Sequence, residues 1–226
     1  MKSAFVLAVT LSSIAVASPA VIQPPETASK DVFLYEFLPT FNFDGPPFGA
    51  LLGAGKTGIG HDFRSLIQFD LTGVTLAANE RATLNLYVGS TRSAGFGNDP
   101  TPATPVTDDL FALTQAWTES TATWGTQPAA GASPLASVTI DSINHYVSFD
   151  ITTQVQAWLA NPSTNFGLHV AQRDIVGGGQ TAAVFDSSAG ANRPYLEIAA
   201  VPEPTSAGVL MAGAAGLLAA RRRRRR

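Results

Sequence analysis

The sequence contains no cysteine, and charged residues make up only 14% of it. Without cysteine there is neither a disulfide framework nor a thiolate metal site, so the fold must rest on its hydrophobic core. Basic residues are scarce between the two ends: residues 18–200 hold seven against sixteen acidic residues, a net charge of −9. This balance argues against nucleic acid as a partner, because that binding needs Lys and Arg to neutralise phosphates. It also argues against simple docking onto an anionic polysaccharide.

The motifs of common enzymes are missing as well. His61, His145 and His169 are isolated, and neither H-E-x-x-H nor G-x-S-x-G occurs. The stretch "GAGKTG" suggests a phosphate loop, but Ala50 stands where that loop needs its first glycine, and no helical pattern follows Lys56. We therefore predict that the protein is not an enzyme.

The N-terminus has the layout of a secretory signal peptide. A basic start at Met1-Lys2 precedes a mostly apolar stretch, Ala4 to Val16, and Ala15-Val16-Ala17 offers a small-x-small cleavage site. We assign residues 1–17 to the signal peptide and residues 18–30 to a linker.

The C-terminus combines an uncharged segment with a basic tail. Residues 205–220 carry no charge and would form a helix of about 24 Å, a little short of the ~30 Å hydrocarbon core. A buried core helix is the alternative, but a core helix rarely ends in consecutive arginines. We therefore expect a transmembrane helix stopped by a cytoplasmic tail, formed by Arg221, Arg222, Arg223, Arg224, Arg225 and Arg226.

Together, the motif Val201-Pro202-Glu203-Pro204, the apolar helix and the arginine cluster resemble a PEP-CTERM sorting signal over residues 201–226. The resemblance implies an exosortase as partner, a membrane transpeptidase of Gram-negative bacteria that make exopolysaccharide. It also implies an inner-membrane anchor before processing, and then release or reattachment at the outer surface or in the extracellular matrix.

Between these ends the apolar residues recur with a period of two. Alternation of this kind, broken by segments rich in Gly, Pro, Asn and Ser, predicts an antiparallel β-sandwich of the jelly-roll type. One stretch, 151–162, has helical spacing instead, with Trp158 on its apolar face, Thr152 or Thr153 as a cap and Asn161-Pro162 as its end. The expected strands are 31–38, 63–71, 82–88, 108–117, 136–140, 145–151, 166–172, 182–186 and 195–199.

Read in order, these segments resemble a DNRLRE domain, a group close to carbohydrate-binding module family 96. The pieces that carry the resemblance are R-S-L-x-x-F-D-L, W-T-E-S-T-A-T-W, D-I-T-x-x-V-Q-x-W and R-P-Y-L. The literal string that names the group is absent. The resemblance covers about 31–199 and implies a jelly-roll domain, placed here at 31–200, with polysaccharide binding in some members.

The candidate sugar site is the stretch "AWTESTATW". It brings Trp117, Glu119 and Trp124 close in sequence, and sugar binding typically sets an aromatic face against a pyranose beside a carboxylate. Arg64 is a further candidate ligand. The alternative for both tryptophans is a structural plug at the edge of the sandwich, which we favour.

Calcium is the one cofactor that the sequence leaves open. Hard oxygen ligands are plentiful, yet no EF-hand loop is present, so the metal candidates are only Asp31, Asp108, Asp109 and Glu197.

Three functions remain. The first is a non-catalytic polysaccharide-binding module of the cell surface or biofilm. The second is a structural matrix protein without sugar specificity, and the third is a polysaccharide-degrading enzyme. A sheet face with two or more exposed aromatic residues would favour the first of these.

Overall fold

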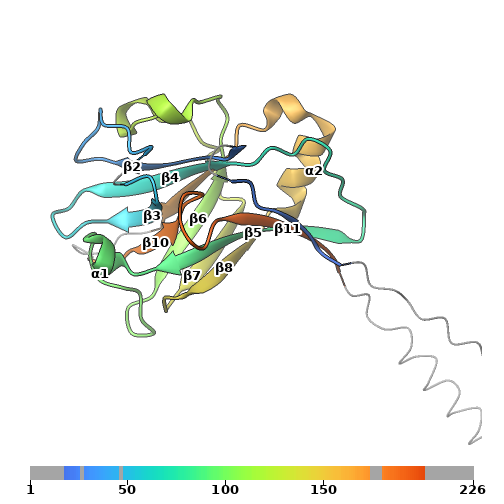
Figure 1. The fold of residues 1–226 in the computed structure, drawn as a ribbon. Coiled ribbons are helices and arrows are strands. Elements are labelled where there is room, and N and C mark those ends of the chain that lie inside the picture. The colour runs from blue at the N-terminus through green and yellow to red at the C-terminus, as the bar shows by residue number, and fades with distance from the viewer. Residues whose placement is uncertain (1–17, 26–27, 46–47, 174–179, 202–226) are drawn as a thin grey trace, which may run out of the picture. The chain divides into compact units, whose positions relative to one another are not determined.

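The computed structural model describes residues 18–25, 28–45, 48–173 and 180–201, and Ala20–Val201 form a compact unit (Figure 1). The described part is almost entirely β-structure, which confirms the all-β class. Its helices are α1 (Thr91–Ala94), α2 (Thr152–Ala160) and three short 3₁₀ turns. The strands are β1 (Ala20–Ile22), β2 (Lys30–Tyr35), β3 (Leu51–Lys56), β4 (Asp62–Gln68), β5 (Glu80–Gly89), β6 (Val106–Ala112), β7 (Ala136–Ile140), β8 (His145–Asp150), β9 (Leu168–Gln172), β10 (Ala183–Asp186) and β11 (Tyr195–Ala200).

The strands form one continuous antiparallel sheet that curls into two layers (Figure 1). In the first layer, β5 pairs with β8 along one edge and with β11 and β10 along the other. In the second layer, β4 pairs with β2 along one edge and with β3 and β9 along the other, and β9 continues to β6 and β7. Strand β3 pairs with both β10 and β4, so it joins the two layers.

The main core lies between these layers. Leu84 and Leu86 of β5 belong to the same buried cluster as Leu110 of β6 and Val170 of β9, and none of the four is exposed. Each such side chain contributes about 1.5–3 kcal/mol when it leaves water. The period of two in the sequence is therefore the pattern of a sheet with one face in this core.

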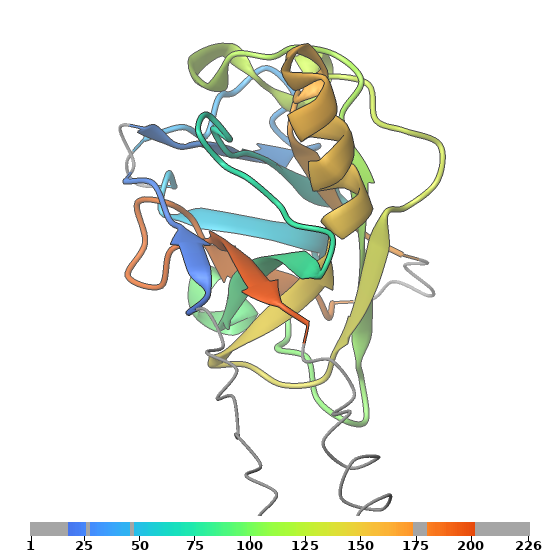
Figure 2. The same cartoon turned by 90° about the vertical axis from the view of Figure 1, so that its right-hand side faces the viewer.

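Helix α2 covers one end of the core (Figure 2). Val155 and Trp158 lie in the main cluster, which confirms the prediction that Trp158 is a core residue. The helix ends at Ala160, before Asn161, as predicted. Its start differs from the prediction: no threonine side chain caps it, and the Asp150 carboxylate instead accepts hydrogen bonds from the Thr152 N–H and hydroxyl, at 3.0 and 2.6 Å.

The nine predicted strands are all present, and two further strands were missed. Strand β1 lies in the segment 18–30 that we expected to be a linker, and it pairs with β11. Strand β3 contains the stretch "LLGAGK", so the glycine-rich motif is extended backbone and not a phosphate loop. A Cβ at Gly55 would lie only 2.3 Å from the Ala182 Cβ, so glycine permits this close approach of the chain. The same glycines have no side chains, and the strand therefore lacks the alternating pattern.

Ser65 of β4 holds β3 and β4 together beyond their two paired positions. Its side chain is fully buried, and its hydroxyl donates to the Gly53 carbonyl at 2.9 Å and accepts from the Gly53 N–H at 2.6 Å. The hydroxyl therefore replaces backbone partners where β3 diverges from β4, and it satisfies two buried groups that would otherwise be unpaired.

The terminal signals predicted from the sequence concern residues outside this description. The signal peptide, 1–17, and nearly the whole sorting signal, from Pro202 through Arg226, are not among the described residues. Within the described ranges, no helix has the length and apolar character needed to cross a membrane.

Candidate functional site

Trp117 lies beneath the surface rather than on it. It follows β6 by five residues, is 8% exposed, and packs in a second buried cluster with Val32, Leu34 and Leu66. Its indole N–H donates to the Phe166 carbonyl at 2.8 Å. Both the ring and its polar group are therefore used inside the protein, which is the arrangement of a structural plug.

The Glu119 carboxylate binds the backbone of the neighbouring strand. Its Oε1 accepts a hydrogen bond from the Asp31 N–H at 2.6 Å. The side chain of Asn42 donates to the Glu119 and Ala122 carbonyls, both at 2.7 Å, so the loop that follows β2 is fastened to this stretch. Glu119 thus fastens the "WTESTATW" segment to the backbone of β2.

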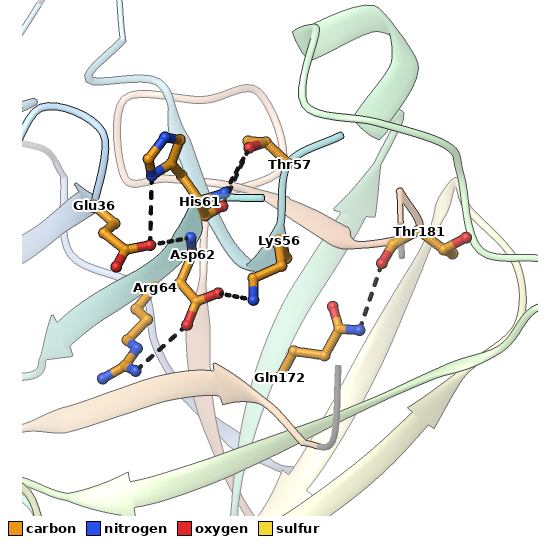
Figure 3. A network of polar contacts seen from close by, with 8 residues as sticks. All are labelled: Glu36, Lys56, Thr57, His61, Asp62, Arg64, Gln172 and Thr181. Atoms are coloured by element: carbon orange, nitrogen blue, oxygen red, sulfur yellow. Dashed lines mark hydrogen bonds and ion pairs between the residues drawn. The ribbon is translucent and has the colours of Figure 1, made fainter. Parts of the chain in front are cut away.

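Trp124 and Arg64 form a partly exposed pair beside this plug. The Arg64 guanidinium lies 4.7 Å from the centre of the Trp124 ring, a cation–π geometry, and both side chains are half-buried. Figure 3 shows Arg64 within a row of ion pairs, where Asp62 contacts Arg64 at 3.9 Å and Lys56 at 3.3 Å. This pair is the part of the predicted sugar site that stays accessible.

His169, on β9, faces the same side of the sheet and is neutral. Burial, and then the charge of Arg64, lower its pKa to about 4. Its Nε2 is buried and has no hydrogen-bond partner within the described ranges. His169 therefore adds little positive charge to this face at neutral pH.

The four metal candidates are not brought together. Asp31 accepts a hydrogen bond from the Ser188 N–H at 2.9 Å, while Asp109 accepts two from Arg173, at 2.6 and 2.8 Å, and one from Ser137. Burial by itself would raise the pKa of Asp109, but the hydrogen bonds from Arg173 and Ser137 outweigh it and the pKa is lowered. Among the described residues, no three His, Asp or Glu side chains form a metal-binding group.

Asp108 and Glu197 lie on different layers, in β6 and β11. Asp108 is completely buried, and neither carboxylate oxygen has a hydrogen-bond partner in the described part of the chain. Burial, followed by the negative charge of Asp109, raises its pKa well above the usual range. Glu197 is half-buried on the outer face of the first layer.

An aromatic row that the sequence analysis missed lies on that outer face. Tyr87, Tyr146 and Tyr195 come from β5, β8 and β11, and all three are half-buried. The ring centres of Tyr87 and Tyr146 are 5.2 Å apart and those of Tyr146 and Tyr195 are 5.1 Å apart, with interplanar angles of 73° and 70°. Edge-to-face contacts of this kind are favourable. We call this row the tyrosine face.

The strand register explains how the row is assembled. Tyr87 lies directly opposite Tyr146, whereas Tyr195 lies opposite Asn85, so Tyr146 and Tyr195 belong to strands on the two sides of β5. Because their rings meet across β5, Asn85 beneath them is only 3% exposed although it points away from the core. Asn85 accepts a hydrogen bond from Ser148 at 2.6 Å and donates to the Thr83 carbonyl at 3.1 Å.

The hydroxyls of Tyr146 and Tyr195 remain protonated over the physiological range. Burial raises the pKa of Tyr146, and Tyr195, Asp186 and Tyr87 raise it further. Burial and the charge of Glu197 raise the pKa of Tyr195 in the same way. The row therefore offers ring surfaces together with hydroxyl groups that can donate hydrogen bonds.

A cleft of about 620 Å³ lies at the α2 end of the domain. Its apolar lining includes Phe69, Leu71 and Trp158, and its polar lining includes Asp70 and Asn165. Phe69 and Trp158 are nearly buried, at 6% and 5% exposed, so they form a floor rather than a projecting platform. The tyrosine face is instead an aromatic surface on the sheet itself, whereas the exposed phenylalanines Phe37, Phe41 and Phe48 belong to the loop that follows β2.

Comparison with protein-family models matches residues 48–200 to carbohydrate-binding module family 96. The chain belongs to this family. Comparison with curated proteins finds no match. The residues matched to family 96 include all three tyrosines of the tyrosine face, as well as Arg64 and Trp124.

Sequence reasoning missed the tyrosine face because its members are far apart in the chain. Each tyrosine occupies a solvent-facing position of a correctly predicted strand, and that alternation was a usable signal. Which strands are neighbours, however, follows from the pairing of β5 with β8 and β11, which the local pattern does not contain.

Proposed function

We propose that this protein is a non-catalytic polysaccharide-binding module and that the tyrosine face is its binding surface. The observation that carries the proposal is the meeting of three tyrosines, from three neighbouring strands, on the solvent side of one sheet. Membership of a carbohydrate-binding family supports it. We also infer that the two layers are a variant of the jelly roll.

An open sheet face suits the internal segments of a polymer. Sugar rings pack their apolar faces on aromatic rings, and nearby polar groups fix their orientation. Here the tyrosine hydroxyls, Ser148 and Thr83 supply such groups beside the rings. A polymer laid across β8, β5 and β11 would contact several tyrosines at once, and no chain end would be needed.

The proposal is tested by removing one ring at a time. Tyr146→Ala should weaken polysaccharide binding most, by roughly 1–2 kcal/mol, because Tyr146 contacts both other rings. Affinity electrophoresis through gels that contain a panel of polysaccharides, followed by calorimetry, measures the change. Phe41→Ala is the matched control, since Phe41 is 49% exposed and belongs to the loop after β2.

The same experiment separates the two candidate surfaces. If Trp124→Ala abolishes binding and Tyr146→Ala leaves it unchanged, the ligand lies on the Arg64–Trp124 pair and the tyrosine face is rejected. If no polysaccharide in the panel binds, the matrix role without sugar specificity gains support.

We further propose that the protein is exported and sorted by an exosortase, on the sequence features of its two ends. Replacing Pro202, Glu203 and Pro204 by alanine should leave export intact but keep the uncut protein in the inner membrane. Cell fractionation and mass spectrometry locate the variant and show whether it has been cut. The proposal is contradicted if the variant is processed normally and reaches the outer surface.

A further inference from the structure

The tyrosine face also carries negative charge. The register places Glu197, Thr83 and Asp150 in one row across β11, β5 and β8, next to the row of Tyr195, Asn85 and Ser148. Side chains directly opposite one another in antiparallel strands share a face, so Glu197 and Asp150 lie on the same side of the sheet as the tyrosines, and Glu197 is next to Tyr195 along β11.

A third carboxylate, Asp186 of β10, lies close enough to Tyr146 to raise its pKa. One of these carboxylates has a cationic partner, because Arg81 Nε lies 3.8 Å from Asp150 Oδ2. Arg81 can offset only one of the three carboxylates. Aromatic rings and an excess of carboxylates thus share this face.

We propose that the tyrosine face selects polysaccharides whose sugars carry protonated amino groups, an inference that rests on the polysaccharide-binding function proposed above. An ammonium group is attracted both to the face of an aromatic ring and to a carboxylate. A uronate or sulfated chain would bring like charges together on the same surface, which is unfavourable.

Glu197 is the carboxylate best placed to meet such a group. Asp150 holds the start of α2 and Asp186 accepts two hydrogen bonds from Asn192, whereas the Glu197 side chain accepts none from any described residue. Glu197 is two residues from Tyr195 on the same face of β11, and its charge raises the pKa of that tyrosine. An ammonium group above Tyr195 would therefore lie within reach of Glu197.

Three hexasaccharides test the inference: β-1,4-linked glucosamine, its fully N-acetylated counterpart and galacturonate. Calorimetry at pH 6 and low salt should give the order glucosamine, N-acetylglucosamine, galacturonate, from tightest to weakest. Glu197→Gln should lower the affinity for the glucosamine chain about three- to fivefold, the effect of one exposed charge pair, and leave the N-acetylated chain unchanged. Asp44→Asn, which removes an exposed carboxylate from the loop after β2, is the matched control and should change neither.

The outcomes separate this inference from the function on which it rests. Equal affinity for the charged and N-acetylated chains, or an unaltered preference in Glu197→Gln, overturns the inference. If Tyr146→Ala still weakens binding in that case, the proposed polysaccharide-binding function stands. If Tyr146→Ala has no effect on any of the three hexasaccharides, both fail for this face.

Discussion

Asp108 should make the protein less stable at neutral pH than it would be with an amide at this position. The side chain is completely buried in β6, and both carboxylate oxygens lack hydrogen-bond partners among the described residues. Gln172 lies directly opposite on β9, and its Oε1 is also a buried acceptor without a partner in the described part. Asparagine has nearly the same shape as aspartate, and its side-chain N–H can donate a hydrogen bond to the Gln172 acceptor.

The direction of this pH-dependent change in stability follows from the raised pKa of Asp108. Below the pKa of the unfolded chain, near 3.8, the carboxyl is neutral in both states and costs nothing through ionisation. Above it the unfolded chain ionises first, so the free energy of unfolding falls by about 1.4 kcal/mol per pH unit until the folded pKa is reached. The asparagine variant lacks this loss, and satisfying a buried acceptor adds about 1–3 kcal/mol.

Urea denaturation of both proteins between pH 3 and pH 8 measures the effect. We expect Asp108→Asn to be more stable than the unchanged protein at pH 7. The difference between their free energies of unfolding should narrow as the pH falls towards 3.8. The difference between the two proteins isolates Asp108, because all other groups titrate alike in both. A gap that does not depend on pH, or a less stable variant at pH 7, would refute the reasoning.

Three further predictions can be checked by denaturation or NMR. Trp117→Ala should cost about 3–5 kcal/mol of stability, because a buried ring and its hydrogen bond are lost, whereas the half-exposed Trp124→Ala should cost far less in the same urea titration. Ser65→Ala should cost about 1–3 kcal/mol, because it leaves the Gly53 N–H and carbonyl without the hydroxyl that serves both, and an unchanged urea midpoint would contradict this. His169 should titrate near pH 4 in NMR spectra, so stability is lost as the pH falls from 6.5 towards 4, and His169→Gln should flatten that loss.

The sequence predicted the elements of the fold well, because most strands have one face in the core. Phe63, Ile67 and Phe69 alternate with polar residues, and that alternation alone located β4. Strand β3 was not predicted because Gly53 and Gly55 have no side chains that could show the alternation. Strand β1 was not predicted because it is short and lies at the edge of the sheet, where few side chains are buried and no hydrophobic alternation develops.

The candidate site was predicted only in part. The plug role favoured for Trp117 agrees with its burial, since the indole lies in a cluster beneath the surface. The choice of Trp117, Glu119 and Trp124 as a sugar site rested on nearness in sequence, and the structure directs Trp117 and Glu119 inward to β2 and its neighbours. Only Trp124, stacked with Arg64, remains at the surface.

The sequence by itself determined the all-β class, the positions of nine strands and helix α2, and the acidic character of the body, because these depend on composition and local periodicity. Tertiary structure decided which outward-facing residues become neighbours. Tyr87, Tyr146 and Tyr195 form one surface only because β5 pairs with β8 on one edge and β11 on the other. The same pairing sets Glu197 beside them and buries Asn85 under their rings. Strand order arises from long-range packing of the whole core, and no local stretch of sequence encodes it.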